Sequence, residues 1–143
     1  MNKAEIRKAE IEDTPELVPL LEQLGYKSTE IELRNTLATN QRNDEIYVAL
    51  IDNKLVALMS IIYFDYFPSQ EKICRITAIV VDSNVRGSGV GRQLIEFAKD
   101  LSKKRCCAKL EVTTSLAREA TQQYYENIGF TKSSYRYIQD IAG

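Results

Sequence analysis

Three glycines alternate with other residues just after an apolar run in the middle of the chain. The apolar run is Ile79, Val80 and Val81, and the segment that follows contains Arg86, Gly87, Ser88, Gly89, Val90, Gly91 and Arg92. Glycine permits positive φ and lets a ligand approach the backbone. The N–H groups of a first helical turn converge where the helix dipole favours negative charge, and the two arginines can add charge-assisted bonds to phosphate oxygens. The segment therefore predicts an anion-binding loop.

Two common nucleotide-binding fingerprints do not fit this loop. A dinucleotide fingerprint needs a third glycine where the chain has Arg92, and it usually follows the first strand of its domain. The phosphate-binding loop of nucleotide triphosphatases ends in Gly-Lys-Ser or Gly-Lys-Thr, which is missing. A plain glycine turn would explain one glycine, but arginine followed by two alternating glycines favours a phosphate ligand.

A second sequence motif, at residues 124–130, strengthens the interpretation of the glycine loop as a ligand-binding site. Residues 86–91, with Val81 five positions before the arginine, resemble the acetyl-CoA-binding motif of the GCN5-related N-acetyltransferase superfamily. The second signature of that family resembles the run Tyr124-Tyr125-Glu126-Asn127-Ile128-Gly129-Phe130. Two motifs in the right order are more specific than either one alone, and the expected elements match the family fold from residue 4 to about 138.

The resemblance implies a role for each part of the two motifs. Residues 86–92 would hold the pyrophosphate of acetyl-CoA, and the edge of 79–81 would pair with its pantetheine arm. The backbone N–H of Ile79 would polarise the thioester carbonyl, and Tyr125 would protonate the departing thiolate. Transfer would be direct, within a ternary complex and without a metal. Core packing is the alternative role for Tyr125, with Tyr124 as the second candidate acid.

The chain departs from the family at two places. Many relatives carry a glutamate on the strand before the glycine loop, whereas residues 73–81 contain no acid, and Arg118 stands where an asparagine is common. The general base is therefore open. Glu111 and Asp65 are candidates, as are a water relay and an amine that arrives neutral.

The acceptor is expected to be a small-molecule primary amine. Residues 133–137 are similar to the end of aminoalkylphosphonate N-acetyltransferases, which points to amines that carry an anionic group. Three arginines could bind such a group: Arg75, Arg118 and Arg136. Alternatives are a protein lysine or N-terminal acetyltransferase and a regulatory CoA-binding module without activity. The aromatic residues in 63–67 could line an acceptor pocket or form a homodimer contact.

Composition limits the other classes of function. With 143 residues the chain fits one domain, 1–143, and its net charge of −1 argues against nucleic acid or anionic membranes as partners. The first 16 residues are too charged for a signal peptide, and three cysteines are expected as free thiols, so we expect a cytoplasmic protein. No histidine is present, which removes the usual catalytic triads and most zinc sites.

Periodicity predicts a mixed α/β fold with about six strands and four helices. Thr14-Pro15 and Thr29 with Glu32 are typical helix starts, and Asp52-Asn53 predicts a hairpin turn. The strand, helix and strand around the glycine loop should place their two strands parallel. Strands are expected at 4–10, 46–51, 55–64, 73–81, 108–114 and 129–138, and helices at 14–24, 28–40, 89–104 and 117–127.

Overall fold

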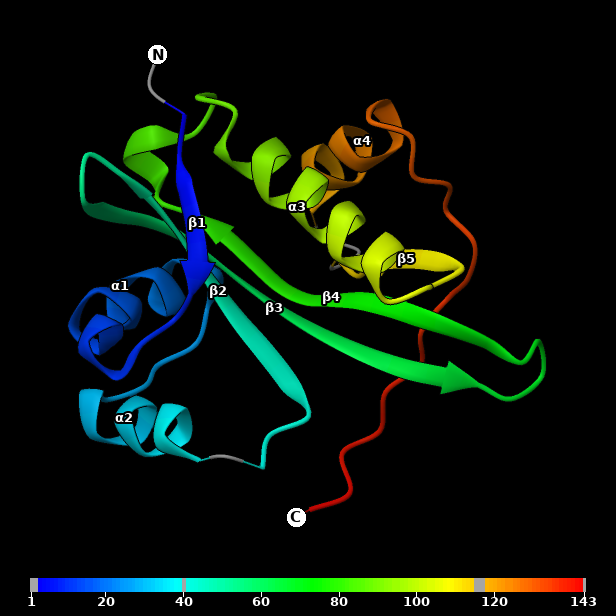
Figure 1. Ribbon diagram of the computed structural model, residues 1–143, viewed down its shortest axis with the longest axis horizontal. Helices are drawn as coiled ribbons and strands as arrows, with labels where there is room; N and C mark the ends of the chain where they lie inside the picture. The colour runs from blue at the N-terminus through cyan, green and yellow to red at the C-terminus, as the bar shows by residue number, and fades with distance from the viewer. Residues whose placement is uncertain (1–2, 40, 115–117, 143) are drawn as a thin grey trace. The chain divides into compact units, whose positions relative to one another are not determined.

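Five strands form one sheet within the residues that the computed structural model describes, which are 3–39, 41–114 and 118–142. The chain divides into two compact units, residues 1–113 and 114–143, and the sheet belongs to the first. Its strands lie side by side in chain order (Figure 1). They are β1 Glu5–Lys8, β2 Asp44–Ile51, β3 Lys54–Tyr66, β4 Glu71–Val81 and β5 Lys109–Val112.

Local turn chemistry and one crossover set the strand directions. Asp52 and Asn53 adopt φ of 50° and 65°, the left-handed pair that a two-residue hairpin requires. Each of the strands β1, β2 and β3 is antiparallel to the strand that follows it. β4 and β5 are parallel, as the sequence predicts. The helix that connects the parallel pair is α3, Val90–Lys104.

Helices α1 (Thr14–Leu24) and α2 (Glu30–Ala38) precede the hairpin. The expected capping box of α2 is present, since Thr29 and Glu32 bond each other's backbone N–H. Gly25 ends α1 with φ of 108°. The N-cap of α1 is Asp13, after the short turn η1 (Ile11–Asp13), and not Thr14 as the sequence suggested.

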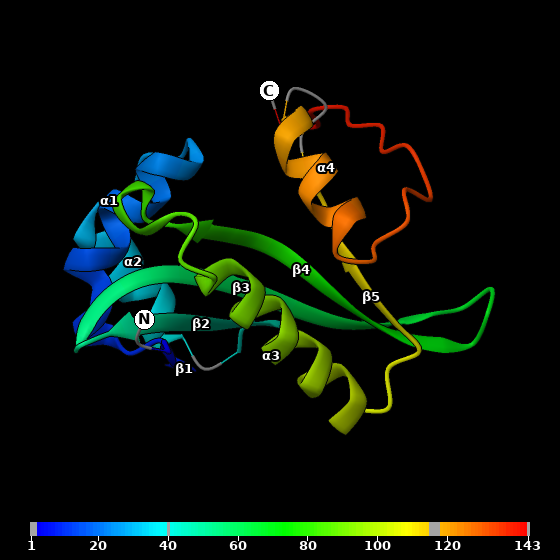
Figure 2. The same cartoon turned by 90° about the horizontal axis from the view of Figure 1, so that it is seen from above.

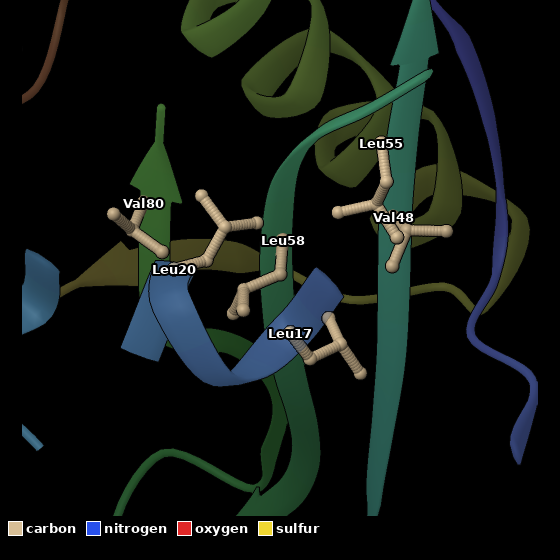
Figure 3. Close-up of a cluster of buried hydrophobic side chains, with 6 residues drawn as sticks. All are labelled: Leu17, Leu20, Val48, Leu55, Leu58 and Val80. Atoms are coloured by element: carbon tan, nitrogen blue, oxygen red, sulfur yellow. The ribbon is translucent and has the colours of Figure 1, made fainter. Parts of the chain in front are cut away.

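The leucines of α1 and the apolar face of α3 cover opposite faces of the sheet. Leu17 and Leu20 pack on Val48, Leu55, Leu58 and Val80 in one buried cluster (Figure 3). On β2 the neighbouring residue, Tyr47, points to the other face, where its ring meets Phe97 of α3 at 5.0 Å between centroids. Both views show α1 and α3 over different parts of the sheet (Figures 1 and 2).

The prediction of a sixth strand at 129–138 is wrong. The second unit contains α4 (Glu119–Asn127), and its described residues after α4 form no helix or strand. Residues 131–142 are all exposed. Their tyrosines and isoleucines favour a strand, but a strand exists only where a neighbour accepts its backbone hydrogen bonds. Across the described ranges, no helix has the length and apolar composition needed to span a membrane.

A buried carboxylate joins β1 to α1, and removing its charge should weaken the fold. Asp13, 6% exposed, accepts two bonds from the Arg7 guanidinium at 2.8 and 2.9 Å and one from the Glu10 N–H at 2.7 Å. Asp13→Asn should lower the free energy of unfolding at pH 7 by about 2 kcal/mol in urea titrations. Glu96→Gln, which breaks only an exposed pair with Lys99, should cost less than about 1 kcal/mol.

The Asp13 contribution should also depend on pH. The Arg7 hydrogen bonds hold the pKa of Asp13 below its ordinary value of 3.8, against the opposing effect of burial. A lowered folded-state pKa means stability that is present above the ordinary value and is lost as pH falls through the folded pKa. The difference between wild type and Asp13→Asn should therefore shrink below pH 4. A difference that stays constant down to pH 2 would contradict this account.

Candidate functional site

One edge of β4 has no strand beside it along its last five residues. β4 pairs with β3 along its length, but β5 pairs only with Ile73 to Ile76 and ends at Val112. Among the described residues, no strand pairs with 77–81 on the β5 side. The opening begins at a β-bulge, because Ser60 opposes Ala78 while Ile61 opposes Ile76, which leaves Thr77 unopposed.

The alternation of backbone groups identifies which N–H groups face this open edge. The N–H of Asp82 donates to the carbonyl of Val56 on β3 at 2.8 Å. Successive N–H groups alternate sides in a strand, so the N–H of Val80 faces β3, whereas those of Ile79 and Val81 face the open edge. Arg86 Nε donates to the Val81 carbonyl from that side at 3.3 Å. The backbone N–H of Ile79, between the bulge and the glycine loop, therefore faces the side of β4 on which no described strand pairs with it.

The glycine loop continues directly from this edge. Asp82 caps the short turn η2 (Ser83–Val85) by accepting the Asn84 N–H at 3.0 Å. Gly87 and Gly89 then adopt φ of 84° and 89°, and a Cβ added to either would meet no atom within 4 Å. Gly91 instead lies within the first turn of α3. Two of the three glycines thus adopt the left-handed conformation. No protein atom lies in the positions that their side chains would occupy.

The first turn of α3 presents unpaired donors to that space. The first N–H with an intrahelical partner is that of Gln93, which donates to the Gly89 carbonyl at 3.0 Å. The N–H groups of Val90, Gly91 and Arg92 therefore have no acceptor within the helix. With two exposed arginines beside it, the start of this 15-residue helix has the donors and the positive charge expected of the predicted anion cradle.

One residue that positions the loop is not apparent from the sequence. Gln23, on α1, accepts the Ser83 N–H at 2.9 Å through Oε1. Its Nε2 donates to Asp82 Oδ1 at 3.5 Å. This glutamine lies 60 residues before the loop, so no local pattern could indicate it.

In the second unit, the other signature forms a helix end. Gly129 has φ of 105°, its N–H donates to the Glu126 carbonyl at 3.2 Å, and the Phe130 N–H donates to the Tyr125 carbonyl at 2.9 Å. This is a Schellman motif, which needs glycine at the left-handed position and an apolar residue after it. The Phe130 ring packs edge-on against the Tyr125 ring, with centroids 5.6 Å apart. The Gly-Phe pair therefore fixes the end of the helix that carries Tyr125.

Tyr125 is 8% exposed, whereas its neighbour Tyr124 is 39% exposed. Burial raises the pKa of the Tyr125 phenol, and the positive charge of Arg118 partly opposes this. The phenol is therefore protonated at neutral pH and is able to donate a proton. The contact with Phe130 gives the same ring a packing role as well.

The two carboxylates considered as candidate bases, Glu111 and Asp65, lie in different surroundings. Glu111 Oε1 accepts from the Arg75 guanidinium at 2.7 and 2.8 Å, and that guanidinium also lies over the Phe64 ring. Glu111 and Arg75 therefore pair with each other, while Asp65 is exposed. Burial raises the pKa of Cys74 and Cys107, so neither thiol is activated. No metal-binding cluster of His, Cys, Asp or Glu occurs in the described part of the chain.

Comparison with known proteins agrees with this geometry. Residues 5–130 match the model of the acetyltransferase (GNAT) family, and the chain belongs to that family. Members of the family use acetyl-CoA as co-substrate.

Individual relatives are more distant. An uncharacterized N-acetyltransferase of Shouchella clausii is 29% identical over 76% of this chain, which spans 64% of that protein's length. An aminoalkylphosphonate N-acetyltransferase of Salmonella typhimurium is 24% identical over 99% of this chain and 94% of its own length. A crystal structure described as a transcriptional regulator from Bacillus halodurans shares the fold, with a TM-score of 0.84 at 21% identity, covering 97% of this chain and 100% of that one.

Proposed function

We propose that the protein is an N-acetyltransferase that moves the acetyl group of acetyl-CoA to the primary amine of a small molecule. The observation that carries the proposal is the open edge of β4, which is followed by the turn η2, the glycine loop and the start of α3. An extended pantetheine arm needs backbone partners along a strand edge, and a pyrophosphate needs converging N–H groups. The chain offers both in the order in which the two parts of CoA are joined.

Each part of the site has a distinct task in this proposal. Acetyl-CoA supplies the activated acetyl group that the amine attacks directly. The N–H groups of residues 90–92, with Arg86 and Arg92, hold the pyrophosphate. The Ile79 N–H donates to the thioester carbonyl oxygen and stabilises the negative charge that develops there. Tyr125 donates its phenolic proton to the departing sulfur.

Residues 73–81 of β4 contain no carboxylate, Glu71 at the start of β4 pairs with Lys109, and Glu111 is held by Arg75. We therefore propose an amine that reaches the site neutral or loses its proton through water. The Ser60 and Thr77 hydroxyls bond each other at the bulge and would be polar neighbours for such a water. The absence of a carboxylate from residues 73–81 also favours one competing function, a CoA-binding module without transfer activity.

The name of one relative supports the proposed acceptor class. A relative of nearly the same length is named for aminoalkylphosphonates, so amines with an anionic group come first. A protein amine is the alternative acceptor.

Thermal unfolding with and without acetyl-CoA, followed by thiol release against a panel of amines, tests the proposal. Ligand at 100 times its dissociation constant should add about 2.7 kcal/mol of stability, which shifts the melting temperature by several degrees. The panel should contain aminoalkylphosphonates, neutral amines and lysine peptides. A shift with release on small amines supports the proposal. Release only on peptides would replace the acceptor class, a shift without release would favour the module, and no shift would overturn the cofactor site.

The Gln23 contacts predict a selective effect on cofactor binding. Gln23→Ala removes both bonds to the loop, each worth about 1 kcal/mol. We expect the dissociation constant of acetyl-CoA to rise by roughly 3- to 10-fold, measured by calorimetry, with little change in kcat. Glu22→Ala, also exposed on α1, is the control and should leave both values unchanged. Equal effects of the two substitutions would remove the positioning role.

A further inference from the structure

Arg75 is held in one orientation where the pairing of β4 with β5 ends. Its Nε and Nη2 both donate to Glu111 Oε1, at 2.8 and 2.7 Å. The carbon of its guanidinium lies 4.7 Å from the centre of the Phe64 ring. Ile76 and Val112, one position further along, form the last pair between the two strands in the described part of the chain. The carboxylate sets the direction of the guanidinium, and the ring sets its plane.

The end of this guanidinium keeps donors that the protein does not use. Arginine carries five N–H donors, and the bonds to Glu111 use the edge that Nε and Nη2 form. Among the described residues, no other group accepts a hydrogen bond from Arg75. The two parallel N–H groups of the outer edge, one on Nη1 and one on Nη2, are therefore free of described partners. Such a fork matches two oxygens of a carboxylate, phosphate or phosphonate.

Strand alternation shows on which face of the sheet Arg75 lies. Leu58 packs on α1, and Ser60 and Ile62 follow it on the same face of β3 at two-residue spacing. Ile62 opposes Arg75, so Arg75 shares this face. The hydroxyl of Ser60 at the bulge is on it as well. Ile79 is four residues from Arg75 along β4, which is at most about 13 Å between their Cα atoms.

We propose that Arg75 determines acceptor specificity by binding an oxyanion group of the amine substrate, and that Glu111 and Phe64 position its guanidinium for this contact. This role rests on the proposed function, in which the thioester carbonyl lies at the Ile79 N–H. The arginine side chain itself spans part of the separation between Ile79 and Arg75. The acceptor is therefore short, with only a few bonds between its amine and its oxyanion, as in small aminoalkyl phosphonates and carboxylates.

Prior orientation is what makes Arg75 selective. A solvated arginine loses rotamer freedom when it binds an anion, whereas the contacts with Glu111 and Phe64 already restrict this side chain. The charge of Glu111 offsets that of Arg75, so the site attracts anions weakly from a distance. Recognition depends instead on the directional fork, which rewards an oxyanion in the correct place.

A second arginine provides a matched control on the opposite face of the sheet. Arg105 donates to Glu45 Oε2 at 2.7 Å, and its guanidinium carbon lies 4.2 Å from the centre of the Tyr63 ring. Tyr63 is adjacent to Phe64 on β3, so the two rings point to opposite faces. Arg105→Gln therefore removes the same kinds of contact as Arg75→Gln, but away from the proposed acceptor.

Calorimetric titration with 2-aminoethylphosphonate in saturating CoA tests the contact without any reaction. CoA carries no acetyl group to transfer, and under the proposed function it fills the glycine loop, so the probe cannot bind there. Arg75→Gln should raise the dissociation constant of the probe by about 10- to 100-fold. Arg75→Lys keeps the charge but loses the fork, and it should raise the constant by about 3- to 10-fold. Arg105→Gln should change it by less than about twofold.

The outcomes of this titration are distinct. No binding of the probe to the wild type would overturn the inference, as would equal effects of Arg75→Gln and Arg105→Gln, which indicate adventitious anion binding. Full affinity in Arg75→Gln would also overturn it. A parallel titration with 3-aminopropanoate shows whether the site takes carboxylates as well as phosphonates, and dependence of either ligand on Arg75 supports the inference.

Initial rates of acetyl transfer separate specificity from a structural role. With 2-aminoethylphosphonate, Arg75→Gln should raise KM by about 10- to 100-fold and leave kcat within about threefold. With propylamine, which has no anionic group, both constants should stay near those of the wild type. An equal loss with both amines would overturn the selective role. Unchanged constants in Arg75→Gln would overturn the inference and leave the proposed function intact, whereas failure of acetyl-CoA to bind would overturn the proposed function itself.

Discussion

Replacing Tyr125 with Phe should lower the turnover number by about 10²- to 10⁴-fold, the usual contribution of a general acid. The substitution removes only the hydroxyl, because the Phe ring can keep the edge-on contact with Phe130. Acetyl-CoA affinity should therefore stay within about twofold, since the phosphate contacts assigned to residues 86–92 are untouched. Initial rates of thiol release and calorimetric titration with acetyl-CoA measure the two quantities separately.

Tyr124→Phe is the matched control for this experiment. It removes the hydroxyl of the adjacent tyrosine, whose ring lies 5.8 Å from that of Tyr125 but is far more exposed. Its turnover should stay near that of the wild type. If Tyr124→Phe loses the activity and Tyr125→Phe keeps it, the roles are reversed. If both retain full turnover, the proton reaches the sulfur from another source and the assignment to Tyr125 is wrong.

Replacing Gly89 with Ala should weaken acetyl-CoA binding by about 10- to 100-fold, or roughly 1.4–2.8 kcal/mol. Gly89 caps α3 with φ of 89°, a conformation that alanine adopts at a cost of about 1 kcal/mol. The new methyl group would also enter the clear space before the helix, where the phosphate is proposed to lie. Calorimetric titration with acetyl-CoA and with free CoA should show the same loss, because both carry the pyrophosphate.

Gly25→Ala separates the strain from the loss of the site. Gly25 caps the C-terminal end of α1 with φ of 108°, and its added Cβ also meets open space. Both substitutions should lower the free energy of unfolding by about 1 kcal/mol, but Gly25→Ala should retain acetyl-CoA affinity. Similar affinities for the two variants would show that the space before α3 does not receive the phosphate.

Much of the fold was predictable because its signals are local. A capping box, a left-handed Asp-Asn turn and an amphipathic period each depend on residues a few positions apart, and each produced the expected element. The Gly-Phe pair after α4 is similar, since the Schellman motif closes within six residues. One local signal failed: Asp13, and not Thr14, occupies the N-cap position of α1, and its side chain bonds Arg7 and the Glu10 N–H instead of the helix.

Contacts between distant residues were not predictable in this way. Glu111 was a candidate base from its residue type, and only the register of β4 and β5 shows that it pairs with Arg75. Gln23 carries no motif and gains its position through the packing of α1. The expected strand at 129–138 failed for the same reason, since its residue types fit a strand but no described neighbour pairs with it.

By itself, the sequence determined the family, the glycine loop before α3 and the helix that carries Tyr125, because each is encoded in a short run of residues with defined backbone requirements. Only the tertiary structure decided that β5 ends at Val112 while β4 continues to Val81, which leaves the Ile79 N–H on an open edge. It likewise decided which charged groups pair, such as Arg75 with Glu111. These features depend on strand register and helix packing, and both are set by contacts between residues far apart in the chain.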